Sequence, residues 1–176
     1  IPDMKKYVSG TGSPMYYAAR IAKEKYPDAK IVFVGPCVAK RKEAQRDEAV
    51  DFVMTFEEVS SIFDAFEVNL EIVQPYAMEF SSVREAHGFA QAGGVMGAVK
   101  AFLKMEADKI NAIQVSDLNK KNIGTLRAYA KSGKAPGQFI EVMACEGGCI
   151  TGPSTHSGSN GKRQLVQELA KQEKTY

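Results

Sequence analysis

The sequence predicts an α/β protein in which a mainly parallel β-sheet is flanked by helices. Short apolar runs rich in β-branched and aromatic residues alternate with segments whose apolar residues recur at helical spacing. Gly and Pro residues mark the turns between the two kinds of segment. Strands that alternate with helices form parallel sheets, because each helix returns the chain to the side where the next strand begins.

The first half of the chain contains two strand-and-helix alternations. Ser13 followed by Pro14 is typical of a helix N-terminus, since Ser is a good N-cap and Pro fits the first helical position. The continuous apolar run over 31–34 predicts a strand that is buried on both faces. The expected elements in order are a helix over 14–25, strands over 31–34 and 49–54, a helix over 55–66 and a short strand over 71–73.

The second half continues the alternation after a long loop over 75–88. A glycine pair, Gly93 and Gly94, opens the next helix, and a polar connection over 152–161 precedes the last one. The expected elements are a helix over 93–105, a strand over 112–115, a helix over 117–131, a strand over 138–143 and a helix over 162–173.

Composition excludes several classes of function. With 176 residues, 44% of them apolar, the chain can form one ordinary domain or two small lobes. The net charge of +2 comes without a basic block, so we expect no nucleic-acid partner. The longest apolar runs are far too short to cross a bilayer, so we expect no membrane partner. Three cysteines, an odd number, favour a reducing compartment, and we expect a cytoplasmic protein.

The three cysteines lie in two turns about a hundred residues apart. Cys37 follows Gly35 and Pro36, whereas Cys145 and Cys149 are separated by a glutamate and two glycines. Glycines at this spacing let the backbone wrap closely around a bulky inorganic group while both thiolates face it. Both turns follow predicted strands, and the carboxyl ends of parallel strands meet at one sheet edge. We therefore expect the three sulfur atoms to converge.

Thiolates select soft metals, so an iron–sulfur cluster is the favoured ligand of these turns. A cubane cluster takes about four cysteines, and this chain has three. The fourth position then belongs to an upstream residue, a partner, solvent or substrate. A zinc site made of the three cysteines and His156 is the alternative, although zinc ligands usually come from closely spaced pairs.

Two long motifs resemble signatures of the [FeFe]-hydrogenase active-site domain. The third signature of that family is similar to the stretch Glu141-Val142-Met143-Ala144-Cys145-Glu146-Gly147-Gly148-Cys149-Ile150-Thr151-Gly152. The second signature is similar to Pro36-Cys37-Val38-Ala39-Lys40-Arg41-Lys42-Glu43. Gly93-Gly94-Val95-Met96 matches another stretch in type and order. The resemblance covers nearly the whole chain and implies part of a two-lobed active-site domain.

The resemblance implies a hydrogenase that reversibly reduces protons to hydrogen. Cys37, Cys145 and Cys149 would hold a [4Fe-4S] cubane, and Cys149 would also bridge to a two-iron subcluster that carries CO and cyanide. Lys40 would be the catalytic residue that hydrogen-bonds a cyanide, a charge-assisted contact. Met143 would pack beside the two-iron unit, and Glu43 would support the lysine. An electron-transfer partner, or additional iron–sulfur domains, would exchange electrons with the site.

The sequence also departs from the family pattern. Gly35 stands where the family commonly has methionine, and residues 152–155 replace a run of glycines and a glutamine. These departures resemble a divergent, sensory branch. A non-catalytic member that binds a [4Fe-4S] cluster, or senses redox state or hydrogen, without the two-iron subcluster is therefore the alternative. Lys40 could also belong to a solvated basic helix start beside Arg41 and Lys42.

The first residues suggest that residues 1–176 are a piece of a longer polypeptide. The chain starts at Ile1 without an initiator methionine, and the double-cysteine signature that precedes this region in the family is absent. We expect the isolated chain to fold without metal and to be inactive.

Overall fold

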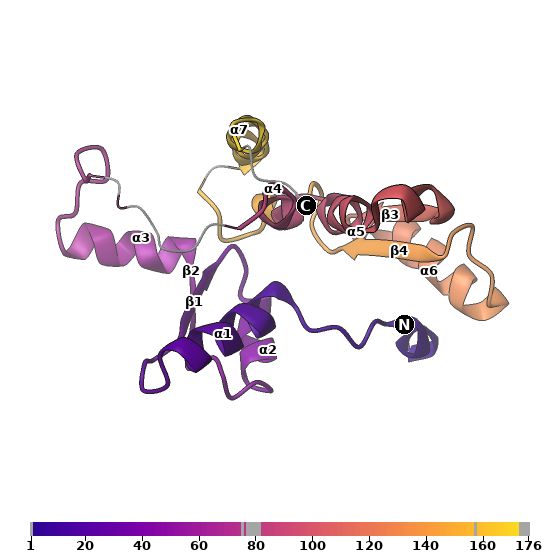
Figure 1. Ribbon diagram of the computed structural model, residues 1–176, viewed down its shortest axis with the longest axis horizontal. Helices are drawn as coiled ribbons and strands as arrows, with labels where there is room; N and C mark the ends of the chain where they lie inside the picture. Colours follow the sequence, from indigo (N-terminus) through magenta and orange to yellow (C-terminus); the bar gives the residue numbers. More distant parts are fainter. Residues whose placement is uncertain (1, 75, 77–81, 157, 173–176) are drawn as a thin grey trace. The chain divides into compact units, whose positions relative to one another are not determined.

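The computed structural model describes residues 2–74, 76, 82–156 and 158–172, and its elements are labelled in Figure 1. The chain divides into two compact units. The Cys37 unit comprises the described residues within Ser9–Ala77 and Pro153–His156. The Cys145 unit comprises those within Ile1–Val8, Met78–Gly152 and Ser157–Tyr176.

The Cys37 unit is built on two parallel strands that pair residue for residue, from Val32 with Phe52 to Gly35 with Thr55. Three helices accompany them, and α1 carries the predicted Ser13 cap with Pro14 at its start. Thr55 and Glu58 form a capping box at the start of α3. The elements are α1 (Pro14–Lys25), β1 (Val32–Gly35), α2 (Ala39–Ala44), β2 (Phe52–Thr55) and α3 (Phe56–Ala65).

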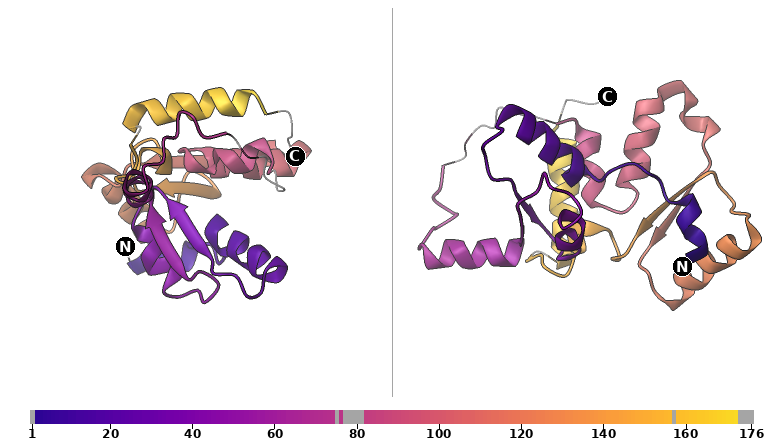
Figure 2. Two further views of the ribbon diagram at one scale, coloured as in Figure 1. Left: turned by 90° about the vertical axis from the view of Figure 1, so that its left-hand side faces the viewer. Right: turned by 90° about the horizontal axis from the view of Figure 1, so that it is seen from below.

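One face of the β1 and β2 pair packs on α1. Met15 and Ala19 of α1 are 2% and 3% exposed and form the core of this unit with Val50. Phe33 and Val53, which pair across the two strands, pack against that core. Figure 2 (left) shows the two strands side by side with α1 along one side of them.

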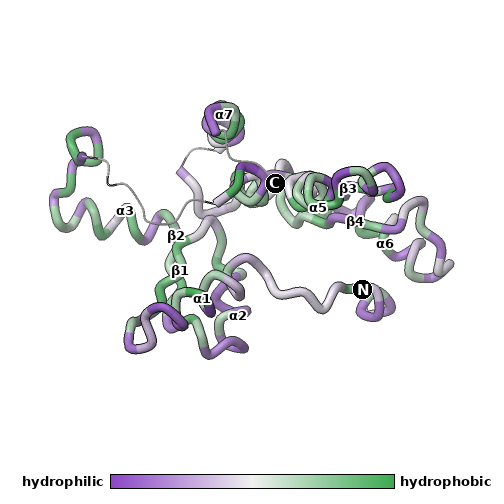
Figure 3. The backbone as a smooth tube through the Cα atoms, in the orientation of Figure 1, coloured by the Kyte–Doolittle hydropathy of each residue, from purple (hydrophilic) through white to green (hydrophobic). Residues whose placement is uncertain are grey.

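The opposite face of this sheet is exposed, so the prediction of a strand buried on both faces is wrong. Val32, Val34 and Phe52 are 46%, 39% and 60% exposed. Successive side chains of a strand point to opposite faces, and α1 covers only the face that holds Phe33. Figure 3 shows that both strands are hydrophobic along their length. The apolar run over 31–34 therefore shows that both faces of the strand are apolar, but not that both are buried.

The predicted strand over 71–73 is also wrong. The Asn69 side chain accepts a hydrogen bond from the Glu71 backbone N–H at 2.9 Å, and the Asn69 carbonyl accepts one from Ile72 at 3.3 Å. An Asn side chain that binds the backbone two residues on makes a turn. Of the predicted loop over 75–88, residues 75 and 77–81 lie outside the described residues, and 84–87 form a short helix.

The Cys145 unit contains a second parallel pair, β3 (Ala112–Ser116) and β4 (Phe139–Met143), in which Ser116 pairs with Met143. Figure 2 (right) shows both strands beside α6 and the N-terminal turn. The remaining elements of this unit are η1 (Pro2–Tyr7), α4 (Arg84–His87), η2 (Gly88–Ala90), α5 (Gly94–Leu103), η3 (Lys104–Lys109), α6 (Lys120–Ser132), η4 (Cys149–Thr151) and α7 (Gly158–Ala170).

The three helices predicted for this unit are confirmed as α5, α6 and α7, but their first or last residues differ from the predicted ones. The side chain of Asn119 caps α6, so that helix begins three residues later than expected, and Gly133 ends it in a left-handed conformation. Helix α5 ends at Leu103, where a 3-10 turn replaces the last predicted turn. Helix α7 starts at Gly158, inside the stretch expected to be a polar connection.

The α/β class is confirmed, but the expectation of one sheet is corrected. The described residues form two separate parallel pairs, β1 with β2 and β3 with β4. Periodicity along a chain predicts strands, not which strands share a sheet, because strand partners are chosen by long-range packing. Among the described residues, no helix has the length and apolar content needed to cross a membrane.

Candidate functional site

The loop that carries Cys145 and Cys149 leaves the carboxyl end of β4 and is fixed by Ser116 at the end of β3. The Ser116 hydroxyl donates to the Cys145 carbonyl at 3.4 Å and accepts the Gly147 N–H at 3.1 Å. The Leu118 N–H extends the pairing beyond the strands by donating to the Ala144 carbonyl at 3.1 Å. The Ser116 side chain thus holds the backbone of the loop at Cys145 and again at Gly147.

Two consecutive glycines make the loop possible. Gly147 and Gly148 have φ angles of +81° and +99°, which L side chains rarely adopt. A Cβ at Gly148 would lie 2.4 Å from the Ala92 backbone nitrogen, a distance that Cβ atoms in proteins essentially never show. The loop therefore turns back on itself and lies directly against the backbone that precedes α5.

A buried carboxylate joins this loop to α5. Glu141 on β4 is 5% exposed and accepts the backbone N–H groups of Gly93 at 2.6 Å and Met96 at 2.7 Å. An anionic acceptor at a helix N-terminus satisfies donors that have no partner within the helix. The Ala92 N–H donates to the Gly147 carbonyl at 2.9 Å. The glycine stretch over 93–96 and the cysteine loop thus form one hydrogen-bonded assembly.

The side chains that this assembly presents are soft sulfur donors. Met143 is half-buried at the end of β4. Cys145 is half-buried, and Cys149, which starts η4, is exposed. No disulfide involves any of the chain's three cysteines, all of which are described.

Cys37 lies in the other unit, two residues after β1. Its sulfur accepts the Ala39 backbone N–H at 3.3 Å, and its side chain is half-buried. The Pro36 carbonyl next to it accepts the Ser154 N–H at 3.2 Å. Ser154 belongs to the same unit as Cys37, so this hydrogen bond holds residues 153–156 against the Cys37 turn within that unit.

Lys40 and Glu43 form an ion pair on α2. The Lys40 ammonium lies 2.5 Å from Glu43 Oε2, and the Ser13 hydroxyl donates to Glu43 Oε1. Burial alone raises the pKa of Glu43, but the hydrogen bonds from Lys40 and Ser13 outweigh it and lower the pKa below its usual range. Glu43 is therefore an anion at neutral pH.

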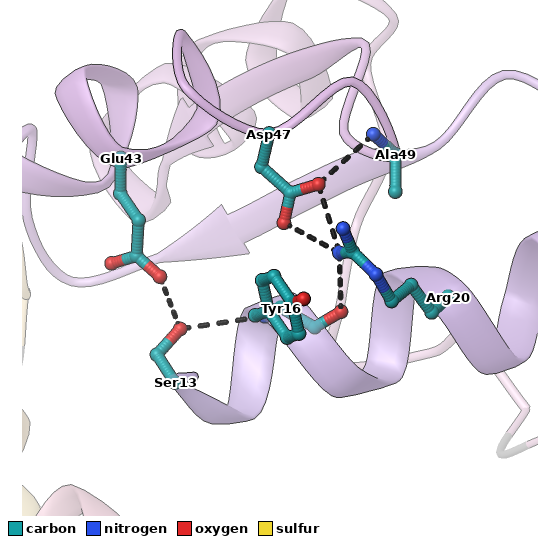
Figure 4. A network of polar contacts seen from close by, with 6 residues as sticks. All are labelled: Ser13, Tyr16, Arg20, Glu43, Asp47 and Ala49. Atoms are coloured by element: carbon teal, nitrogen blue, oxygen red, sulfur yellow. Dashed lines mark hydrogen bonds and ion pairs between the residues drawn. The ribbon is translucent and has the colours of Figure 1, made fainter. Parts of the chain in front are cut away.

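A second polar contact ties α1 to the turn after α2 (Figure 4). Arg20 donates to both carboxylate oxygens of Asp47 at 2.9 Å, and its guanidinium lies 3.6 Å from the centre of the Tyr16 ring. Asp47 is buried and also accepts the Ala49 N–H at 3.2 Å. The bond from Arg20 lowers the pKa of Asp47. Helix α1 is thus joined to the region of α2 by two polar pairs, Ser13 with Glu43 and Arg20 with Asp47.

The structure brings the predicted site residues together in two groups. Cys145 and Cys149 share one loop with Met143 before it, and Cys37 shares the start of α2 with Lys40 and Glu43. Within either unit, the described residues contain no group of three metal-binding side chains. The two cysteine turns follow strands of two different sheets, so a shared sheet edge does not bring the three sulfur atoms together. Their convergence stays a prediction, as does the zinc alternative.

Sequence patterns do not reveal the contacts of Glu141, Ser116 and Ser13. The sequence predicts Ser13 only as a helix cap and assigns no role to Glu141 or Ser116. An acidic residue inside an apolar strand is the one signal that was available for Glu141, because a buried charge needs a partner. The hydroxyl contacts of Ser116 and Ser13 span 31 and 30 residues, so local patterns carry no trace of them.

The donor set fits a thiolate-bound iron–sulfur cluster. Cys145 and Cys149 flank Gly147 and Gly148, whose positive φ angles let the chain turn sharply between the two sulfur atoms, as a bulky inorganic group requires. Three thiolates are one fewer than a cubane usually takes, so a cubane held by these cysteines would need one further ligand.

Comparison with known proteins adds a family and several relatives. The family described as "Iron only hydrogenase large subunit, C-terminal domain" matches residues 1–153. The chain is 27% identical to the zebrafish (Danio rerio) "Cytosolic Fe-S cluster assembly factor narfl", covering 95% of this chain and 54% of that protein. It is also 27% identical to "Iron hydrogenase 1" of Clostridium pasteurianum, covering 86% of this chain and 34% of the relative. The chain thus spans about half or less of these relatives.

Solved structures of hydrogenases share the fold. The [FeFe]-hydrogenase HydA(deltaEFG) matches with a TM-score of 0.66 at 21% identity, covering 99% of this chain and 63% of that one. Apo HydA1 of Chlamydomonas reinhardtii, variant C377H, matches with a TM-score of 0.65 at 21% identity, covering 99% and 62%. At this identity the likeness concerns the fold alone.

Proposed function

The chain belongs to the iron-only hydrogenase large subunit family, as a C-terminal domain, and from this premise we propose that it binds the iron–sulfur cofactor of a hydrogenase. Cys37, Cys145 and Cys149 would ligate a [4Fe-4S] cluster, and Cys149 would also bridge to a two-iron subcluster. The observation that carries the proposal is the Cys145 to Cys149 loop, with two thiols around a left-handed glycine pair.

The other residues of the site have separable tasks in this proposal. When bound, the cofactor supplies the redox chemistry that interconverts protons and electrons with hydrogen. The Lys40 ammonium, paired with anionic Glu43, would donate a charge-assisted hydrogen bond to a cyanide ligand. Met143 would form an apolar, polarisable wall that excludes water. Ser116 and Glu141 would keep the cysteine loop in one conformation.

The activity and setting of the whole protein belong to the same proposal. The full-length polypeptide would reduce protons reversibly, with an electron-transfer partner or further iron–sulfur domains as the source of electrons. The zebrafish relative is named as cytosolic, which supports a cytoplasmic location. The isolated chain, with three cysteines, would be inactive.

A second candidate is a non-catalytic cluster-binding domain of the divergent, sensory type. It is favoured by the similarity to a protein named as a cluster assembly factor, which covers 95% of this chain. Such a member would keep the [4Fe-4S] cluster and lack the two-iron unit.

Infrared spectroscopy of the matured full-length protein separates the two candidates. The proposal predicts CO and cyanide stretching bands together with hydrogen evolution from a chemical reductant. A protein that contains iron and acid-labile sulfide but no such bands supports the cluster-binding alternative. Stoichiometric zinc without sulfide in anaerobically purified protein would reject both.

A further inference from the structure

We propose that Ser13 is a positioning residue for Lys40, acting through the Glu43 carboxylate. The hydroxyl of Ser13 fixes one oxygen of Glu43, and the other oxygen fixes the Lys40 ammonium. What Lys40 then does rests on the proposed function, but the positioning does not. Ser13 lies 27 residues before Lys40, outside the cysteine motif that points to the lysine.

The Ser13 hydroxyl has a defined orientation. Ser13 is the N-cap of α1, with φ −74° and ψ 167°, and its oxygen accepts the Tyr16 backbone N–H at 3.4 Å. A serine hydroxyl has one proton to donate, and here that proton is directed to Glu43. The same group therefore starts a helix and binds the carboxylate.

Glu43 is held at both oxygens by different elements. Oε1 is bound by Ser13 at the start of α1, and Oε2 by Lys40 on α2. The side chains of Lys40 and Glu43 are 28% and 36% exposed, so both ends of the pair are partly shielded from solvent. A lysine side chain has large rotamer entropy, and a carboxylate fixed from two sides restricts where its ammonium can lie.

Helix α1 does not depend on Ser13 alone for its place. The bidentate bond from Arg20 to Asp47 and the contacts of Met15 and Ala19 with the core hold the helix independently (Figure 4). Loss of the Ser13 hydroxyl should thus release Glu43 while α1 stays docked.

Three substitutions in the full 176-residue chain separate capping from positioning. Ser13→Thr keeps both functions. Ser13→Asp keeps an acceptor for the Tyr16 N–H but places a second carboxylate against Glu43. Ser13→Ala loses both. Asn119→Ala is the matched control, because it removes the N-cap of α6 in the other unit, where Asn119 accepts the Asn122 N–H at 2.9 Å.

NMR titration of the metal-free protein measures the effect. The pKa of the Glu43 carboxyl should rise in Ser13→Ala and rise further in Ser13→Asp, and the Lys40 ammonium protons should exchange faster with water. Ser13→Thr and Asn119→Ala should leave both quantities at their wild-type values. Unchanged values in both Ser13→Ala and Ser13→Asp, or a change in Ser13→Thr as large as in Ser13→Ala, would overturn the proposal. Ser13→Asp decides the matter if Ser13→Ala does not fold.

A cofactor-loaded sample adds a readout of what Lys40 contacts. In matured full-length protein, Ser13→Asp should shift a cyanide stretching band and Asn119→Ala should not. An unshifted band in Ser13→Asp would contradict a role of Ser13 at the cofactor. If the wild type has no cyanide bands, the proposed function fails, and the NMR titration still tests the positioning of Lys40.

Discussion

At the scale of single residues, the site depends on backbone conformations that only particular side chains allow. Gly147 and Gly148 are left-handed, and the second lies against the Ala92 nitrogen. This arrangement makes the sharp turn between Cys145 and Cys149 and places it against the backbone before α5. The consequence is that a single methyl group should disable it.

Gly148→Ala should abolish cluster uptake. The new Cβ needs both a disfavoured φ and displacement of backbone at 2.4 Å, and backbone strain alone costs about 1–3 kcal/mol. Gly124→Ala, at an exposed α6 position with open space around it, should instead stabilise the chain by about 1 kcal/mol. Urea denaturation and iron analysis after reconstitution measure both effects, and a Gly148→Ala chain that binds iron normally would contradict the role of the glycine pair.

Asp51 should make the Cys37 unit sensitive to acid. The Ile31 N–H, followed by Lys30, lowers the pKa of Asp51 from 3.8 to about 2. A carboxyl with a depressed pKa in the folded state stabilises the fold above its unfolded pKa, and that stability is lost as pH falls through the folded value. Urea midpoints should therefore fall between pH 3.8 and about 2.

Asp51→Asn should reduce this acid dependence, because the amide oxygen still accepts the Ile31 N–H but carries no charge. The remaining dependence includes the contributions of Glu43 and Asp47, whose pKa values are also lowered. Asp28→Asn changes an exposed carboxylate and should keep the wild-type shape of the curve. Parallel curves for Asp51→Asn and wild type would rule out Asp51 as the source.

Local spacing in the sequence predicts part of the candidate site's geometry, because residues three apart on a helix are neighbours. Lys40 and Glu43 form an ion pair on α2, whereas the ligand roles of Cys37, Cys145 and Cys149 stay predictions. The partners Ser116 and Glu141 act across the fold, through contacts that span 29 to 48 residues, and short-range patterns cannot reveal them.

At the scale of helices and strands, the Ser13 cap predicts the start of α1 correctly, whereas the Asn119 cap of α6 is not among the expectations and burial is predicted wrongly. Helix α3 starts at Phe56, within one residue of the expected position. The apolar run over 31–34 forms β1 almost as expected, yet Val32 and Val34 are exposed. Local chemistry determines where a helix starts, whereas burial depends on which other segments cover the strand.

Glu141 should control the first turn of α5. In Glu141→Gln the amide NH2 would face one of the two backbone donors, Gly93 N–H or Met96 N–H, and a buried unsatisfied donor costs about 1–3 kcal/mol. Amide hydrogen exchange at those two residues should accelerate by about 5-fold to 150-fold, as 1.4 kcal/mol corresponds to tenfold.

The matched control for this prediction is Glu106→Gln. Glu106 has a 65% exposed side chain and pairs with Lys109 at the surface of η3, so its loss should change stability by less than about 1 kcal/mol. Equal exchange rates in Glu141→Gln and wild type would show that the carboxylate does not hold the helix.

At the scale of the whole molecule, two small units replace the expected single sheet. Each unit carries a parallel strand pair, and in each a cysteine follows the carboxyl end of a strand, Cys37 after β1 and Cys145 after β4. Strand and helix periodicity predicts the α/β class but not this partition. In the proposed function, which rests on the family assignment, each unit would supply cysteine ligands to the iron–sulfur cluster.

The central proposal is that Cys37, Cys145 and Cys149 all ligate one cluster. The isolated chain is expected to purify without metal, so the test is anaerobic reconstitution with iron, sulfide and an excess of small thiol that supplies the missing fourth ligand. It compares the wild type with Cys37→Ser, Cys145→Ser and Cys149→Ser. The account predicts about four irons and four sulfides per wild-type chain and less than half of that in every variant. A Cys37→Ser chain that retains the wild-type iron and sulfide content would contradict it.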